Sequence, residues 1–260
     1  SSQMLGVKLF GNRPITFLRI FYLSFAACQK RCFGSGGFLV EWRNSINFGT
    51  MDKIKNCVFC DLKLNKGEVI FETENFFAGI GIGLAAPGHV MLIPKKHFAC
   101  CADILKDLRP EFEDLKSLIF EKIKDAFGTP FLVEYGIFGQ SVFHAHLHFI
   151  PKSRKATEFY PAYEIKDIFR EMQIPDGIPV RPALWKTAAA MKRQNGGYVF
   201  LQNGDCAFLF ERFEKELSYR HFFNEKMRVK DVPARWQDTT AEQEKIDVVK
   251  KQITCQLLKF

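Results

Sequence analysis

Residues 144–148 of the chain are His-Ala-His-Leu-His, inside an apolar run that extends from residue 142 to residue 150. Alternation with a period of two predicts a β-strand there and places the three imidazoles on one face of it. Histidine is scarce in this chain, with six in 260 residues, so three within five positions need an explanation. Packing in the core is a poor explanation for these histidines, because each buried imidazole needs a hydrogen-bond partner. The stretch therefore predicts a strand whose histidines serve catalysis or metal binding.

The sequence around this stretch predicts several short strands and one long helix. Four further strands are expected, at residues 69–72, 76–82, 89–94 and 131–135. Pro110 opens a helix with apolar residues at three- and four-residue spacing, and Gly128 ends it. Strands joined by short loops, with one helix covering a face, predict an α+β fold for residues 51–151.

A C-terminal α+β extension is expected from residue 152 to residue 260, where it would cover or complete the site. Its elements are expected at residues 183–193 (a helix), 198–201 and 206–210 (a hairpin) and 241–258 (a charged helix). The hairpin is predicted from Asn203-Gly204, because Asn-Gly supplies the positive φ angles of a tight turn.

The first 50 residues differ from the rest in charge. They carry six basic residues and one acid, a net charge of +5 out of +8, which leaves +3 for the remaining chain. A basic segment without acids, as in residues 1–40, is typical of an organellar transit peptide. The alternative is a segment that is not native, with translation starting at Met51. The protein is accordingly expected in the cytoplasm, or in an organelle if residues 1–50 are a targeting peptide.

Composition also bears on two classes of partner. No apolar run reaches the ~18 residues that a membrane span needs. The +3 charge of residues 51–260 gives nucleic-acid binding little support.

The eight cysteines do not suggest a disulfide framework, because the chain is far longer than the small scaffolds that need one. Cys57 and Cys60 instead form a CxxC pair, which in a reducing compartment indicates metal or redox chemistry.

Three segments resemble landmarks of the histidine triad (HIT) family. Residues 139–150, Gly-Gln-Ser-Val-Phe-His-Ala-His-Leu-His-Phe-Ile, resemble its signature. Residues 88–97, Gly-His-Val-Met-Leu-Ile-Pro-Lys-Lys-His, are similar to a second landmark, a strand that ends in Ile-Pro-Lys-x-His. The CxxC at residues 57–60 opens the domain as it does in the zinc-containing, bacterial-type branch. The resemblance covers residues 57–151, and the C-terminal region is additional to it.

The resemblance implies an antiparallel sheet with flanking helices, and a nucleotide hydrolase or nucleotidyl transferase that acts at an α-phosphate. Family members attack with the middle histidine, here His146, and form a covalent nucleotidyl-histidine intermediate. A neutral imidazole is a competent nucleophile near pH 7. His148 is expected to contact the phosphate and to assist proton transfer or the leaving group. Gln140 and Ser141 match the family's pair of residues that donate hydrogen bonds to phosphate oxygens.

The resemblance also implies a zinc site. In similar zinc-binding members the ligands lie at the positions of Cys57, Cys60, His97 and His144. Two thiolates and two imidazoles are a typical ligand set for a closed, structural zinc ion. Such an ion would anchor His144 to the start of the domain and so hold His146 in place. The alternative is a pair of buried free thiols beside two ordinary histidines.

The chain departs from the family pattern where a ribose would bind. Many members have an acidic residue in the strand before the Gly-His landmark, whereas residues 78–82 contain no carboxylate. Glu134 is expected either to replace that ribose acceptor or to be a solvated residue at the edge of the sheet. Residues 218–223, Ser-Tyr-Arg-His-Phe-Phe, predict either a packed aromatic core or a surface that stacks a base and grips a phosphate.

Two other functions are consistent with these residues. The first is a zinc-dependent hydrolase in which His144, His146 and His148 all bind metal and activate water. The second is a non-catalytic adaptor with a HIT fold that binds a nucleotide or a protein, which the missing ribose carboxylate favours. HIT members are often homodimers, and the C-terminal half could substitute for a second subunit.

Overall fold

The computed structural model describes residues 57–61, 69–80, 85–156 and 162–227. The leader, the charged helix expected near the C-terminus and residues 81–82 of the second expected strand lie outside these ranges. Among the described residues, no helix combines the length and the apolar character that a membrane crossing requires.

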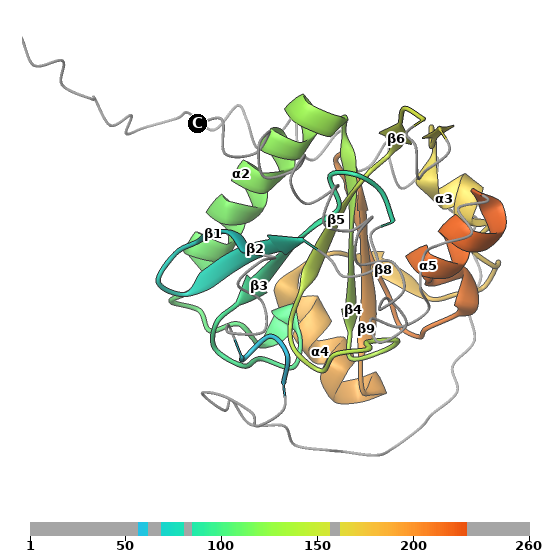
Figure 1. Ribbon diagram of the computed structural model, residues 1–260. Coiled ribbons are helices and arrows are strands. Elements are labelled where there is room, and N and C mark those ends of the chain that lie inside the picture. Colours follow the sequence, from blue (N-terminus) through green and yellow to red (C-terminus); the bar gives the residue numbers. More distant parts are fainter. Residues whose placement is uncertain (1–56, 62–68, 81–84, 157–161, 228–260) are drawn as a thin grey trace, which may run out of the picture. The chain divides into compact units, whose positions relative to one another are not determined.

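One antiparallel sheet of eight strands organises the described residues (Figure 1). In spatial order its strands are β1 (Val69–Glu72), β2 (Phe76–Ile80), β3 (Val90–Pro94), β5 (Leu147–Pro151), β4 (Pro130–Gly136), β9 (Tyr198–Asn203), β10 (Cys206–Phe210) and β8 (Val180–Pro182). A second, two-stranded sheet pairs β6 (Ser153–Arg154) with β7 (Tyr163–Glu164). The expected hairpin of β9 and β10 is present, and Gly204 adopts a φ of +60° in its turn. β1 and β2 form another antiparallel pair.

Helices flank this sheet, so the α+β fold class is confirmed. The helical elements are η1 (Cys101–Asp103), α2 (Arg109–Phe127), α3 (Ile168–Met172), α4 (Trp185–Asn195), η2 (Lys215–Leu217), α5 (Tyr219–His221) and η3 (Phe222–Lys226). Pro110 lies in the first turn of α2, and Gly128, with a φ of +93°, ends the helix as expected. Figure 1 shows α2 along one side of the sheet and α5 along the other.

The strand expected across residues 142–150 is wrong in its first half. β5 begins at Leu147, so His148 is the one histidine of the three that lies in a strand. The residues before it leave the sheet because their backbone bonds elsewhere: the N–H of Ala145 donates to the carbonyl of Phe98 at 2.6 Å. The three imidazoles therefore do not share one strand face.

The C-terminal residues continue the sheet that contains His148. β9 pairs with β4 over its whole length, so β8, β9 and β10 form one continuous sheet with β1 to β5. Along β4, Phe131 stacks on Phe223 of η3, with ring centroids 6.4 Å apart, and Val133 pairs with His148. Because residues of β4 alternate between faces, His148 lies on the face that carries α5 and η3.

Candidate active site

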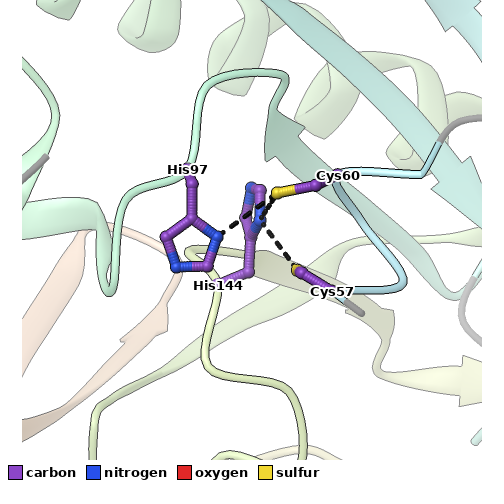
Figure 2. Close-up of side chains that lie close together, drawn as sticks. All are labelled: Cys57, Cys60, His97 and His144. Atoms are coloured by element: carbon purple, nitrogen blue, oxygen red, sulfur yellow. Dashed lines mark hydrogen bonds between the residues drawn. The ribbon is translucent and has the colours of Figure 1, made fainter. Parts of the chain in front are cut away.

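Four potential metal ligands from three separate segments meet beside β3 and β5. Figure 2 shows the two cysteines of one tight turn facing two imidazoles. The turn supplies Cys57 and Cys60, the segment after β3 supplies His97, and the loop before β5 supplies His144. Their ligand atoms all lie within 4.8 Å of one another. The sequence placed these same four residues together.

The geometry of this cluster fits a tetrahedral zinc ion. Nδ1 of His97 lies 3.3 Å from Sγ of Cys60, and Nδ1 of His144 lies 3.4 Å from Sγ of Cys57. Standard zinc bond lengths would separate such S and N ligands by about 3.6 Å. The Nε2–H of His144 donates to the carbonyl of Pro94 at 2.8 Å, which leaves its Nδ1 lone pair facing the sulfurs. Burial lowers the pKa of His144 to about 3, so the ring is neutral, as a metal ligand must be.

Both nitrogens of His144 are thereby occupied, and this weakens one alternative. A metal shared by His144, His146 and His148 would need a nitrogen that His144 does not have to spare. The zinc-dependent hydrolase built on all three histidines is therefore not favoured. Among the described residues, the four-residue cluster is the one group of three or more such side chains with metal-binding proximity.

The backbone of His144 also assigns the tautomer of His146. Nδ1 of His146 lies 2.6 Å from the carbonyl oxygen of His144, and since a carbonyl only accepts, Nδ1 carries the proton. Nε2 therefore keeps its lone pair. Burial lowers the pKa of His146 to about 4, although the bond to the carbonyl opposes this. At neutral pH the ring is uncharged, with an unprotonated nitrogen.

A second hydrogen-bond chain assigns the tautomer of His148. The backbone N–H of Ala85 donates to Nδ1 of His89 at 3.2 Å, so the proton of His89 is on Nε2. That Nε2 lies 3.0 Å from Nδ1 of His148, which accepts the bond and must carry its own proton on Nε2. Burial first, and then electrostatic interaction with His146, His89 and Arg220, hold the pKa of His148 well below its usual value. His148 is therefore a neutral hydrogen-bond donor through Nε2.

Replacing His89 by phenylalanine removes the buried hydrogen bond that orients His148. For a reaction in which His148 takes part, kcat/KM should fall by about 10- to 100-fold, the cost of one such bond. Phenylalanine keeps the ring that packs edge-on against Tyr219, at 5.5 Å between centroids. The ¹⁵N chemical shifts of the His148 ring would check the reason, because loss of the bond frees the other tautomer. A fall in kcat/KM with unchanged His148 shifts would contradict the tautomer assignment.

His146 and His148 line a pocket of about 260 Å³ on the α5 face of the sheet. Their ring centroids are 4.8 Å apart. Ser141 lines the same pocket and is exposed, whereas Gln140 is not part of its wall. The Gln140 side chain instead donates from Nε2 to the carbonyl of Ala99 at 3.0 Å. Of the predicted phosphate-contacting pair, the structure brings Ser141 to the histidines and ties Gln140 to the segment after His97.

Glu134 is neither a ribose acceptor nor a solvated edge residue, so both expectations for it are wrong. It lies in the middle of the sheet, fully buried, on the face opposite His148. One carboxylate oxygen accepts from the backbone N–H of Cys101 at 2.7 Å and the other from the hydroxyl of Tyr198 at 2.7 Å. Burial raises the pKa of Glu134 to about 7 despite these bonds.

A buried carboxyl with this pKa makes stability depend on pH. Unfolded, Glu134 titrates near 4.5, so between that pH and about 7 the folded state holds a proton that the unfolded state releases. Its contribution to stability is full below pH 4.5 and is lost as pH rises through 7. Glu134→Gln, which does not titrate, should gain about 2–3 kcal/mol relative to wild type between pH 5 and pH 8 in denaturant unfolding. Parallel pH profiles of the two proteins would contradict this assignment.

Residues 218–223 contribute both to a packed aromatic core and to the lining of the pocket. Tyr219, Phe222 and Phe223 are buried, as in a packed aromatic core. Arg220 and His221 line the pocket beside the histidines. Sequence reasoning missed the contributions of His89 and Tyr135: His89 stands next to Gly88 in the second landmark, and Tyr135 gave no signal.

Known proteins are similar to this chain over about two fifths of its length. The family model described as HIT domain matches residues 63–155. The "Protein hit" of Bacillus subtilis is 32% identical over 113 residues, which cover 40% of this chain and 77% of the relative. An adenosine 5'-monophosphoramidase of Candida albicans is 32% identical over 117 residues, 39% of this chain and 74% of the relative.

Two further similarities are more partial. A bis(5'-adenosyl)-triphosphatase of Dictyostelium discoideum is 32% identical over 98 residues, 35% of this chain and 64% of the relative. The crystal structure of a HIT family member from Bacillus subtilis covers 37% of this chain and 73% of its own, at 28% identity and a TM-score of 0.34. A TM-score this low adds nothing to the relationship seen in the sequences.

Proposed function

Because this chain belongs to the histidine triad (HIT) family, we propose that it is a nucleotide hydrolase or nucleotidyl transferase that attacks an α-phosphate through His146. Relatives named as a monophosphoramidase and a triphosphatase support nucleotide hydrolysis at the level of the family. The observation that carries the proposal is the 2.6 Å bond from Nδ1 of His146 to the carbonyl of His144, which leaves a lone pair on Nε2 of a pocket-lining residue.

The reaction proceeds in two displacements. In the first, the Nε2 lone pair of His146 forms a bond to the α-phosphorus, and the leaving group departs with the electron pair of the broken bond. An amine leaving group also takes up a proton from solvent. The carbonyl of His144 stabilises the positive charge that the ring gains. In the second, water or another acceptor attacks the phosphorus, the P–N bond breaks, and the proton of the attacking group is released.

Two further residues act on the phosphate. The Nε2–H of His148 donates to a phosphate oxygen, and because His148 is neutral it acts as a hydrogen-bond donor and not as a strong acid. The hydroxyl of Ser141 donates to a second oxygen from the same pocket. Gln140 keeps the segment after His97 in place through Ala99.

We assign the cluster of Cys57, Cys60, His97 and His144 to structural zinc. When bound there, the ion cross-links three segments of the fold and has no part in the reaction. Its effect on the site passes through His144, whose side chain faces the sulfurs while its carbonyl holds His146. The distances between the ligand atoms and the neutral state of His144 support the assignment.

Intact-protein mass spectrometry tests the proposed reaction. The full chain is mixed rapidly with dinucleoside polyphosphates and nucleoside phosphoramidates and kept at neutral pH, because a phosphorus–nitrogen bond is acid-labile. A mass gain of one nucleotidyl group, formed and lost in step with turnover, is the expected result. Turnover without any adduct at the earliest times would instead indicate direct attack by water. If neither turnover nor an adduct is found, the non-catalytic adaptor function replaces the proposed reaction.

A further inference from the structure

One wall of the active-site pocket comes from outside the matched HIT domain. Residues Ser218, Tyr219, Arg220, His221 and Asn224 line the pocket that contains His146 and His148. This wall begins directly after η2 and is formed by α5 and η3, more than sixty residues beyond the end of the match at residue 155.

The wall is fixed to the sheet by Tyr135. The hydroxyl of Tyr135 accepts from the backbone N–H of Tyr219 at 2.7 Å and donates to the carbonyl of Leu217 at 3.2 Å. The ring of Tyr219 then packs against His148, with centroids 5.0 Å apart. Since Arg220 follows Tyr219 directly, with its guanidinium carbon 5.1 Å from the centroid of that ring, its position is set relative to the histidines.

Charge is distributed unevenly around the pocket. Arg220 is the one lysine or arginine among the described residues that line it, and none of them is a carboxylate. After burial, the charge of Arg220 contributes to the lowered pKa values of His89 and His148, so it acts on both rings. The lining of the pocket therefore carries a cation that favours an anionic ligand.

Other residues that line the pocket are apolar. They are Val58 and Phe59 from the CxxC turn, Met91 from β3 and Val142. Phe59 and Met91 belong to a buried hydrophobic cluster, with Val58 and Val142 packed against it. A flat nucleobase suits these residues by its chemistry, whereas Arg220 and the histidines suit phosphate groups.

We propose that Arg220 binds the anionic leaving group of the substrate, so that the protein prefers nucleotides linked to a further phosphate over nucleotides linked to an uncharged amine. This inference rests on the proposed function. A guanidinium presents a planar fork of donors that matches phosphate. As the bond to the leaving phosphate breaks, negative charge grows on that group, so Arg220 stabilises the transition state more than the bound substrate.

The test compares two substrates that share a nucleoside and an α-phosphate. One is a di-adenosine triphosphate, whose leaving group is ADP, and the other is adenosine 5'-phosphoramidate, whose leaving group is ammonia. The ratio to measure is kcat/KM for the triphosphate divided by kcat/KM for the phosphoramidate. Arg220→Gln should lower this ratio by about 10- to 100-fold, and Arg220→Lys should lower it by less. Arg212→Gln is the matched control, because Arg212 is exposed and pairs with Glu214 at 2.9 Å. It should leave the ratio unchanged.

Two results would overturn the proposal. An unchanged ratio in Arg220→Gln excludes a role for Arg220 toward the leaving group. An equal loss for both substrates assigns Arg220 to the shared α-phosphate or to folding, and thermal unfolding of the variant separates these two.

Binding of inorganic triphosphate, measured by calorimetry on the full chain, distinguishes this proposal from the proposed function. If wild type turns over neither substrate, the function fails. The Arg220 anion site still stands in that case if Arg220→Gln weakens triphosphate binding at least tenfold and Arg212→Gln does not. Equal affinity in all three proteins refutes the anion site whatever the activity.

Discussion

Replacing His146 by asparagine should reduce kcat/KM by a factor on the order of 10⁴ or more, because it removes the nucleophile of the proposed reaction. The nucleotidyl adduct seen with wild type should disappear together with turnover. Asparagine is the informative replacement because its amide N–H₂ can still donate to the carbonyl of His144, which His146 holds at 2.6 Å. The pocket is then expected to keep its shape while losing the lone pair.

The control for this variant is Phe143→Asn, the same replacement three residues earlier at a side chain that is 61% exposed. It should leave kcat/KM within about threefold of wild type, as surface changes usually do. Both variants should bind the substrate with similar affinity, so that the loss in His146→Asn lies in kcat. Retention of more than about a hundredth of wild-type kcat, with the same adduct on another residue, would contradict the assignment of His146.

Local signals were sufficient for much of the fold. The hairpin of β9 and β10 follows from Asn203-Gly204, and the two ends of α2 follow from Pro110 and Gly128. Each depends on the conformational preferences of one or two residues, which act wherever the segment lies. The four residues of the proposed zinc site were also found in the sequence, because the family landmarks carry all of them.

Contacts between distant segments account for the errors. His144 and His146 leave the strand because Ala145 bonds to Phe98, and nothing in the alternation of residues 144–148 reports that bond. Glu134 is buried in the middle of the sheet, whereas the sequence predicted a ribose acceptor or a solvated edge residue. The error arises because its hydrogen-bond partners Cys101 and Tyr198 are 33 and 64 residues away in the sequence. A period-two pattern assigns a residue to a face of a strand, but the neighbouring strands decide whether that face is buried.

The role of the C-terminal residues shows the same dependence. The aromatic and basic character of residues 218–223 is evident in the sequence, and it is consistent with a core and with a binding surface. In the structure different side chains of this segment do different things. The ring of Tyr219 packs on His148, and the next residue, Arg220, lines the pocket. The bond from Tyr135 to Tyr219, which fixes this arrangement, joins residues 84 positions apart.

After loss of the His146 nucleophile, loss of the proposed zinc ion should have the largest effect on the protein. In Cys60→Ser we expect the zinc content to fall from about one ion per chain to well below it, because a hydroxyl is a much weaker zinc ligand than a thiolate. Cys60 is buried, and its sulfur lies within 3.5 Å of Nδ1 of both His97 and His144. The variant should lose about 3 kcal/mol or more of folding free energy, which for a domain of this size lowers Tm by roughly 10 °C.

Cys100→Ser is the matched control for the metal. Cys100 is a buried free cysteine like Cys60, and it lies outside the four-residue cluster. It should retain full zinc content by inductively coupled plasma mass spectrometry, even if burial of a hydroxyl costs some stability. Zinc absent from the wild-type protein, or equal zinc in wild type and Cys60→Ser, would contradict the site.

The same variant links the proposed metal to catalysis. His144 connects the two, since its ring faces the cysteine sulfurs and its carbonyl accepts the hydrogen bond from Nδ1–H of His146. Without the ion, the loop before β5 loses the contact that sets this carbonyl, and the Nδ1–H tautomer of His146 is no longer enforced. We therefore expect kcat of Cys60→Ser to fall at temperatures where the variant is still folded. Wild type stripped of zinc by a chelator should lose kcat in the same way and regain it when zinc is restored, whereas added zinc should not restore kcat in Cys60→Ser. Unchanged kcat in a folded, zinc-free protein would separate the cluster from the reaction and leave it a purely stabilising role.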